Sequence, residues 1–273
     1  MIRAFRYAAE SLFSVLFPSN CRICQSPLTE ISNLPVCREC LDSLVPLAGV
    51  LCSVCGEKLF GQHFSGDDAQ PVCGMCRRAA PPFRRAVAFG SYDGALRELV
   101  HLLKYQQIRP AANHLAKLVS QAAGALELPA ELLVIPVPLW PGKRRSRGFN
   151  QAEEIARAVV RFRGAATRIQ LDTTSLVRKR ETASQTGLSR HQRRANVRGA
   201  FAVVAADRVR RRSVLLVDDV MTTGTTAGEC ARVLLRAGAK EVFVATVARA
   251  TKEVAGLGRI AAAASMGGTQ GHA

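Results

Sequence analysis

Several features are scarce in this chain of 273 residues. No apolar run approaches the about 20 residues of a membrane-spanning helix, so the sequence offers no candidate for one. Aromatic residues make up 5% of the chain, which is few for a protein that binds single strands by base stacking. A G-K-[ST] triplet is missing, and this excludes a P-loop. The 48% hydrophobic and 22% charged residues are nevertheless typical of a globular protein.

Acidic residues are also few, with 21 Asp or Glu against 38 Lys or Arg, for a formal net charge of +17. The basic excess is concentrated in residues 143–212, which hold 19 Lys or Arg and 5 Asp or Glu. Clustered positive charge is typical of surfaces that contact phosphate groups, whereas a scattered excess would indicate only a solvated surface. We therefore expect a phosphate-bearing partner.

The N-terminus raises the question of a targeting segment. In residues 1–20, apolar side chains recur every three or four positions up to Pro18, which predicts an amphipathic helix. A signal peptide is the alternative, but Glu10 interrupts the apolar stretch and no small-residue cleavage site follows. We expect a cytoplasmic protein.

Eight of the nine cysteines fall between residues 21 and 76 as four C-x2-C pairs. Two such pairs bring four thiolates to one point, which suits tetrahedral Zn²⁺ and leaves no position for water. The sequence therefore predicts two structural zinc ions. Their ligands would be Cys21, Cys24, Cys37, Cys40, Cys52, Cys55, Cys73 and Cys76.

The cysteine block is also an internal repeat, because "CRICQSPL … LPVCREC" is echoed by "CSVCGEKL … QPVCGMC". One zinc per repeat is the simplest pairing, while interleaved pairing of the first turn with the third stays open. A disulfide framework would suit a secreted domain, and a redox pair would not need four copies. Cys230 stands apart and is expected in the core, and His63 is not expected to be a ligand.

The composition changes near residues 78–84, after which predicted strands and helices alternate. Strands are expected at "AVAFGSY", "ELLVIPVPL", "TTSLVRKR", "SVLLVDD" and "EVFVATVAR", and helices at "GALRELVHLLKY", after Pro110, from near Asn150 and at about 225–237. The basic "WPGKRRSRGF" is expected to be a loop. This alternation predicts an α/β fold with a parallel sheet covered on both faces. The domains would be residues 21–80 and 84–250, followed by a disordered tail at 251–273.

The stretch "SVLLVDDVMTTGTT" places two adjacent carboxylates, Asp218 and Asp219, directly after the predicted strand at 214–217. Backbone N–H groups of the following loop can converge on a phosphate at the helix N-terminus. The loop residues are Thr222, Thr223, Gly224, Thr225 and Thr226. Carboxylates would repel the phosphate itself but would accept hydrogen bonds from vicinal ribose hydroxyls. The motif therefore predicts a site for a ribose 5-phosphate.

The segment "VLLVDDVMTTGTT" resembles the signature of type I phosphoribosyltransferases, which bind phosphoribosyl pyrophosphate (PRPP) with Mg²⁺. Together with the cysteine repeat, "PVPL … RGFNQA" and "RKRETASQTGLSRHQRRANVRGAF", it makes the chain resemble the ComF family of competence-associated proteins. The resemblance implies a type I phosphoribosyltransferase-like domain preceded by a small double zinc ribbon.

The resemblance also implies residue roles. Asp218 and Asp219 would be the catalytic pair that holds the ribose hydroxyls, and residues 222–226 would hold the 5-phosphate. A basic lid at 178–200 would close over the site and stabilise departing pyrophosphate. The other residues implied to bind PRPP are Val137, Pro138, Leu139, Arg178 and Arg180.

Lys104 and Tyr105, on a helix end, match the family more weakly, and both a place in the site and a plain surface position stay open for them. Two functions remain open. One is phosphoribosyl transfer from PRPP to an unidentified acceptor. The other is a non-catalytic component of natural transformation that handles incoming single-stranded DNA, with competence proteins as partners; a PRPP-sensing regulator is a further variant. The intact ribose-phosphate motif favours retained ligand binding.

Overall fold

A computed structural model describes residues 19–28, 30, 32–60, 70–163, 168–182 and 189–250. Most of the predicted N-terminal helix, the whole predicted tail and His63 lie outside these residues. Within the described ranges, no helix has the length and apolar character needed to cross a membrane.

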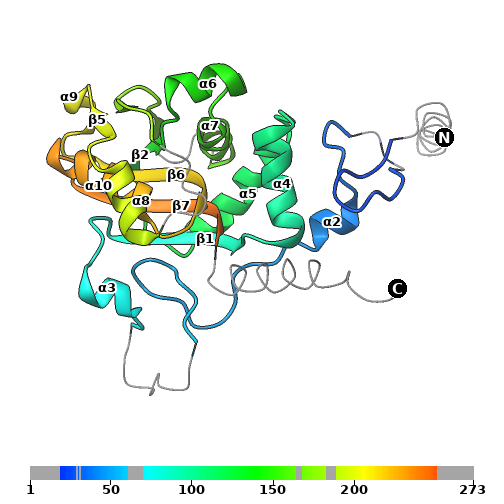
Figure 1. Ribbon diagram of the computed structural model, residues 1–273, viewed down its shortest axis with the longest axis horizontal. Coiled ribbons are helices and arrows are strands. Elements are labelled where there is room, and N and C mark those ends of the chain that lie inside the picture. The colour runs from blue at the N-terminus through cyan, green and yellow to red at the C-terminus, as the bar shows by residue number, and fades with distance from the viewer. Residues whose placement is uncertain are drawn as a thin grey trace, which may run out of the picture.

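The centre of the fold is a five-stranded parallel sheet in the order β1-β7-β6-β2-β3 (Figure 1). Its strands are β1 (Arg85–Ser91), β2 (Glu131–Pro136), β3 (Arg168–Leu171), β6 (Ser213–Met221) and β7 (Glu241–Arg249). The inner strands are almost entirely apolar because helices cover both of their faces. The predicted parallel α/β sheet is confirmed, and the short edge strand β3 is an addition to it.

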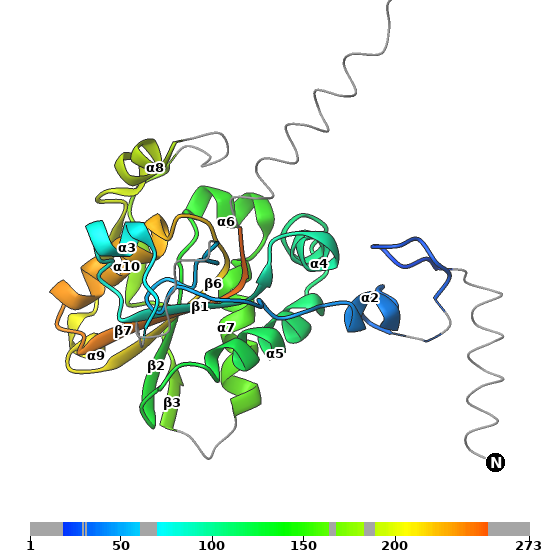
Figure 2. The same cartoon turned by 90° about the horizontal axis from the view of Figure 1, so that it is seen from below.

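The helices cover the two faces of this sheet unequally (Figures 1 and 2). Helices α4 (Gly94–Tyr105), α5 (Ala111–Ala123) and α7 (Gln151–Arg163) share a core with Leu215 and Val217 of β6. Helix α10 (Thr225–Arg236) shares a second core with Val214 and Leu216, because successive side chains of a strand alternate between faces. These four helices are confirmed at their predicted places.

Two sequence predictions for the basic region are wrong. The expected loop "WPGKRRSRGF" contains helix α6 (Pro141–Arg147), because proline is well placed in a first turn and Gly148 ends the helix at φ 82°. The strand expected at "TTSLVRKR" is only β4 (Leu176–Arg178), which lies outside the main sheet. It pairs antiparallel with β5 (Phe201–Val203).

Short helices complete the basic region. Helix α8 (Arg190–Val197) begins at a capping box in which Ser189 and Gln192 satisfy each other's backbone N–H groups. Helix α9 (Ala206–Val209) leads into β6. The apolar periodicity of this stretch is too weak to indicate either helix. The capping box at Ser189 was the available signal for α8.

The two cysteine repeats end in short helices, α2 (Arg38–Asp42) and α3 (Gly74–Arg78), which lie on opposite sides of the domain (Figures 1 and 2). The second repeat joins the edge strand, because the Ala86 backbone N–H donates to the Val54 carbonyl over 2.8 Å. The linker between the repeats reaches the same strand farther along, where the Leu47 N–H donates to the Phe89 carbonyl over 2.7 Å. The second repeat and the linker before it therefore attach to β1.

Candidate functional site

The cysteines form two tetrads, and within each tetrad the sulfur atoms lie within 4.8 Å of one another. The first tetrad is Cys21, Cys24, Cys37 and Cys40, and the second is Cys52, Cys55, Cys73 and Cys76. Of the two pairings that the sequence left open, the structure has the sequential one. Four sulfur donors gathered in this way fit a tetrahedral Zn²⁺ ion. Cys230 belongs to α10 and is fully buried, as expected of a core residue.

Backbone donors prepare both tetrads for a cation. In the first, hydrogen bonds from the side chain and backbone of Ser26 lower the pKa of Cys24 to about 6. In the second, burial opposes ionisation of Cys52, but N–H groups, foremost that of Cys73 at 3.3 Å, lower its pKa to about 7. Burial and the neighbouring cysteines raise the pKa of Cys40 and of Cys76, so each tetrad keeps some of its protons until a cation such as Zn²⁺ displaces them.

The acidic pair lies inside β6 and not after it. The predicted end of the strand at residue 217 is wrong, because β7 continues to pair with β6 as far as Met221 opposite Arg249. Consecutive strand residues face opposite sides of a sheet, but the two carboxylates remain close enough that each changes the pKa of the other. Asp219 lies toward α4 and contacts Lys104, whereas Asp218 lies on the side of Arg178.

Lys104 forms an ion pair with the buried Asp219, with 2.8 Å between Nζ and Oδ2. Of the two positions that the sequence left open for Lys104, the structure has the one beside the acidic pair: its side chain is 20% exposed, and that of Asp219 is 6% exposed. Burial would lower the pKa of Lys104, but the charge of Asp219 outweighs it and holds that pKa above its usual value. The signal in the sequence was its position four residues after the buried Val100, on the same face of the helix.

The two carboxylates titrate in opposite directions. Burial opposes ionisation of Asp219, but Lys104 overcomes this and keeps the pKa of Asp219 below its usual value. Burial, followed by the neighbouring charge of Asp219, raises the pKa of Asp218 well above its usual value. Asp218 is therefore the carboxylate whose ionised form would gain most from a cation or from hydroxyl donors.

The threonine loop turns at Gly224, whose φ of 72° is in the left-handed region, and α10 begins at the next residue. The N-terminal N–H groups of α10 thus point toward the end of β6. Thr222 accepts a 2.9 Å hydrogen bond from Arg193 of α8, which connects the loop to the basic segment.

A cavity of about 490 Å³ lies at the carboxyl end of β6, and we call it the carboxylate cavity. It gathers ten of the twelve residues that the sequence assigned to PRPP. These are Asp218, Asp219, Thr222, Gly224, Thr225, Thr226, Val137, Pro138, Leu139 and Arg178. Thr223 and Arg180 do not line it: Thr223 faces a neighbouring cavity, and the exposed Arg180 donates to the carbonyls of Asn196 and Arg198.

Further residues of the carboxylate cavity were missed in the sequence. Asn150 is 5% exposed, caps α7 through the Ala152 N–H, and donates to the Val137 carbonyl over 3.0 Å. It thereby fixes the turn that follows β2. An asparagine directly before a helix was the available signal.

Cations from α6 and β4 also line the carboxylate cavity. Arg147 donates to Gln151 over 2.7 Å and lies 5.5 Å from the ring centroid of Tyr105, and Lys143 lies one turn earlier. Arg178 lies 5.4 Å from the ring centroid of Phe201, and burial lowers its pKa. The residues of α6 were missed because that segment was expected to be a loop.

Comparison with known proteins gives matches in both parts of the chain. The double zinc ribbon domain matches residues 12–77, and the phosphoribosyl transferase domain matches residues 145–256. DNA utilization protein YhgH of Salmonella typhi is 33% identical over 231 residues, which is 83% of this chain and 95% of that protein. Competence protein F of Haemophilus influenzae is 32% identical over 210 residues, which is 73% of this chain and 84% of that protein.

Among solved structures, the glutamine phosphoribosylpyrophosphate amidotransferase from B. subtilis, complexed with ADP and GMP, matches with 24% identity. The match covers 50% of this chain and 26% of that one, with a TM-score of 0.31. A superposition this partial carries no argument about the site.

Proposed function

The chain belongs to the family of competence protein F and DNA utilization protein YhgH, and from this premise we propose that it binds PRPP or a related ribose 5-phosphate. It is a competence-related protein with a phosphoribosyltransferase-like domain. The observation that carries the proposal is the carboxylate cavity, which combines paired carboxylates, a helix N-terminus and several cations in one space of about 490 Å³. A sugar phosphate presents the matching groups in the same order.

The ribose would lie against the acidic pair. Its hydroxyls would donate to Asp218, since Asp219 is already engaged by Lys104. Hydrogen bonds to an ionised carboxylate are about twice as strong as neutral ones. The 5-phosphate would accept from the backbone N–H groups at Gly224 to Thr226, where the dipole of α10 favours negative charge.

The pyrophosphate of PRPP would lie near the turn at Val137, Pro138 and Leu139, facing the cations of α6. Departure of pyrophosphate develops negative charge, which Lys143 and Arg147 would stabilise. Asp218 fits a Mg²⁺ ion bound with PRPP, because it is a carboxylate in the cavity without an ion-pair partner among the described residues. Bound Mg²⁺ would supply neutralisation of the pyrophosphate charge.

Calorimetric titration of PRPP with Mg²⁺ tests this proposal. Asp218→Asn keeps the size of the side chain but removes its charge, so PRPP affinity should fall at least about tenfold, or about 1.4 kcal/mol. Asp207→Asn on the exposed α9 is the matched control and should bind PRPP like the parent protein. Equal PRPP affinity in the Asp218→Asn variant would refute the ribose site.

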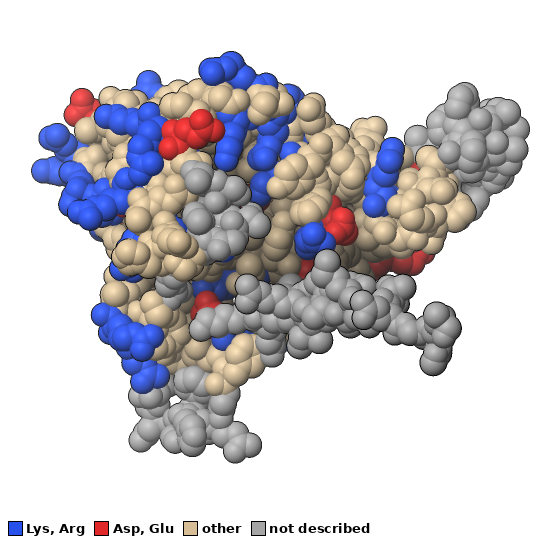
Figure 3. Space-filling view, viewed as in Figure 1, with Lys and Arg blue, Asp and Glu red and all other residues tan. Residues whose placement is uncertain are grey.

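A second candidate function is contact with the backbone of single-stranded DNA. Lys and Arg side chains gather on the upper left of the molecule in Figure 3, near the positions of α8, α9 and β5 in Figure 1. The segment 143–212 supplies exposed residues such as Arg145, Arg198 and Arg210. Such cations would bind phosphates without sequence preference and release counterions.

Salt dependence tests the DNA function. Replacing Arg145 and Arg210 by Ala should lower the slope of log affinity against log salt for single-stranded DNA by about 1 for each lost phosphate contact. Replacing Arg22 and Arg38, exposed in the first cysteine repeat, removes the same charge and is the control. If both pairs change the slope equally, only net charge matters and this surface has no role of its own.

A further inference from the structure

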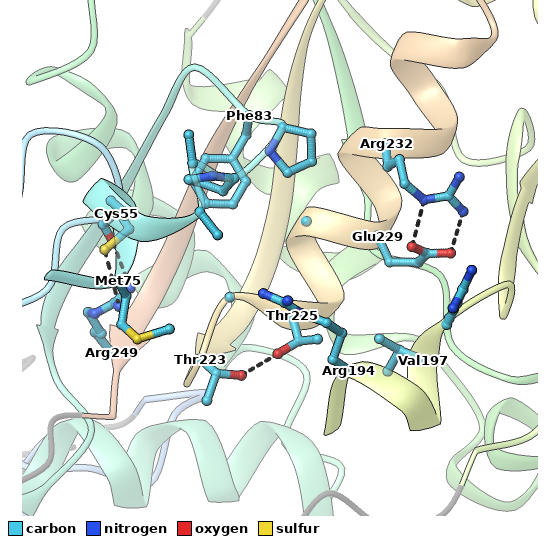
Figure 4. A pocket seen from close by; sticks show the side chains of 18 residues that line it. Cys55, Met75, Phe83, Arg194, Val197, Thr223, Thr225, Glu229, Arg232 and Arg249 are labelled. Atoms are coloured by element: carbon cyan, nitrogen blue, oxygen red, sulfur yellow. Dashed lines mark hydrogen bonds and ion pairs between the residues drawn. The ribbon is translucent and has the colours of Figure 1, made fainter. Parts of the chain in front are cut away.

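A second cavity, of about 450 Å³, lies between the second cysteine repeat, α8 and α10, and we call it the ribbon cavity (Figure 4). The proposed ribose phosphate site does not use it. Its volume falls in the range of about 300–1,000 Å³ that is common for small-molecule sites. Its position beside the threonine loop raises the question of what it binds.

One wall of the ribbon cavity is apolar. It is formed by the chain that leaves the second cysteine repeat, with Met75 of α3, Pro81 and Pro82. Phe83 lies behind the threonine loop, where a Cβ added at Gly224 would be 3.9 Å from the ring, in ordinary van der Waals contact. A flat, apolar group such as a nucleobase can pack on a wall of this kind.

The opposite wall is cationic. Arg194 and Arg198 reach it from the basic segment, and neither has a carboxylate partner among the residues that the structure describes. Arg232 also lines it but is already paired with Glu229 (Figure 4). Guanidinium groups stack on nucleobases and pair with phosphates, so this wall complements a nucleotide.

Arg249 closes the inner end of the ribbon cavity and is 1% exposed. Its terminal nitrogens bind the Cys55 carbonyl and Glu57, each over 2.6 Å, but its Nε has no hydrogen-bond partner within the described ranges. Because this nitrogen is itself enclosed by protein, Arg249 shapes the cavity by holding the second cysteine repeat in place and not by contacting a ligand.

The two cavities meet at the threonine loop, because Gly224 and Thr225 line both of them. A phosphate held by this loop therefore has the carboxylate cavity on one side and the ribbon cavity on the other. A phosphomonoester ends at the loop. A phosphodiester continues from it to a second nucleoside.

We propose that the ribbon cavity binds the nucleoside attached on the 5′ side of the phosphate in the threonine loop, so that the two cavities together hold the two linked nucleosides at the 3′ end of a nucleic acid strand, where the last sugar has a free hydroxyl for Asp218. This inference rests on the proposed ribose phosphate site and extends it. The ribose of the second nucleotide lies at Asp218, and the base of the first packs between Met75 and Arg194. The second cysteine repeat is then one wall of a ligand site.

Gly228 of α10 offers a way to fill the ribbon cavity alone. It lines this cavity and not the other, and a Cβ placed there would meet only Pro82, at 3.7 Å. Gly228→Ala adds that Cβ in ordinary contact, while Gly228→Leu extends a side chain into the space. Both changes replace glycine inside a helix with a better helix former, so both variants should fold.

The experiment measures the affinity of the full, zinc-loaded chain for three ligands by calorimetry. Adenosine 5′-(methyl phosphate) carries the phosphodiester charge without a second nucleoside. Adenylyl-(3′→5′)-adenosine and its deoxy counterpart add that nucleoside as RNA or as DNA. We expect at least one dinucleotide to bind about tenfold more tightly than the methyl ester, with Gly228→Leu abolishing this gain and Gly228→Ala keeping it.

The outcomes separate the two proposals. The ribbon cavity site is overturned if the parent protein binds the dinucleotides no more tightly than the methyl ester, or if the tighter binding persists in Gly228→Leu. The ribose phosphate site still stands in either case if ribose 5-phosphate binds. Absence of binding by ribose 5-phosphate and the methyl ester overturns both. A gain for the ribo or the deoxy dinucleotide alone supports the site and assigns the strand to RNA or to DNA.

Discussion

The first cysteine tetrad is partly exposed, with Cys24 at the surface, whereas all four cysteines of the second tetrad are buried. In the first tetrad, Cys21 packs into the core of α4, α5 and α7 while its partners lie at the margin of that core; all of the second tetrad lies inside the core that α10 shares with the sheet. Two repeats with the same ligand spacing thus have different surroundings. The second tetrad is part of the support of the candidate site.

The contacts of the second repeat explain this difference. The buried Arg249, at the end of β7, pairs with Glu57 and the Cys55 carbonyl. Among the described residues of the first repeat, the ion pair is an exposed one within α2, with 3.7 Å between Arg38 and Asp42. A repeat in the sequence therefore fixes the metal site, while the surroundings decide what else the repeat supports.

One backbone position also shows that the second repeat lies closer to the sheet than the first. The residue after the first C-x2-C pair has positive φ in both repeats, and it is Gln25 in the first and Gly56 in the second. A Cβ on Gly56 would lie 3.0 Å from the Ala86 carbonyl oxygen of β1. Glycine is required there because the second repeat lies directly on the sheet.

The largest expected effect comes from removing one ligand of each tetrad. Structural zinc contributes about 10–16 kcal/mol in small zinc domains, which matches or exceeds the stability of a typical domain. Cys76→Ser should therefore abolish soluble, folded protein, because its tetrad is part of the core. Cys24→Ser should lose about one zinc ion by elemental analysis and retain the cooperative thermal transition of the sheet. Equal loss of folded protein in both variants would contradict the comparison.

The next largest effect is expected at Arg249. Arg249→Met leaves Glu57 and the Cys55 carbonyl without their partner, and breaking a buried pair in this way costs about 3–5 kcal/mol. Thermal unfolding measures this loss. Arg38→Met removes the exposed pair of the first repeat and should change the melting temperature little. If the two variants have the same melting temperature, Arg249 does not connect the second repeat to the sheet.

Exchange at the positive-φ position should have a smaller effect. Gly56→Gln combines left-handed strain with close contact to β1, and should lower the free energy of unfolding by about 2–4 kcal/mol. Gln25→Gly relieves that strain but adds freedom to the unfolded chain, so denaturant unfolding should show almost no change. If Gly56→Gln left the free energy of unfolding unchanged, the second repeat would tolerate separation from β1.

The smallest effect concerns metal release. Under excess chelator, zinc should leave in two phases of equal amplitude, since each tetrad has the four ligands of one ion. The phase of the exposed tetrad should be at least about tenfold faster, equivalent to about 1.4 kcal/mol of activation free energy. Cys24→Ser should remove the fast phase, and an indicator dye for free zinc follows both. A single phase in the parent protein would show that burial does not protect the second ion.

Much of the fold could be predicted from the sequence, because the inner strands are continuous apolar runs and the helices carry clear periodicity and stops. The predictions failed where local signals compete. Helix α6 was mistaken for a loop because basic residues and glycine dominate it, and β4 was placed in the main sheet because its partner β5 was not recognised. Both failures fall in the basic segment, whose charge hides the apolar pattern.

The sequence by itself determined the ligands of both tetrads and the motif that holds Asp218, Gly224 and the threonines, because spacing along the chain fixes these groups locally. Only the tertiary structure decided that Lys104, more than a hundred residues from Asp219, neutralises it. It alone brought Arg249 against Cys55 and opened a cavity between the second repeat and α10. Such contacts depend on how elements far apart in the sequence pack against each other. Local patterns along the sequence contain no information about the distance between those elements in space.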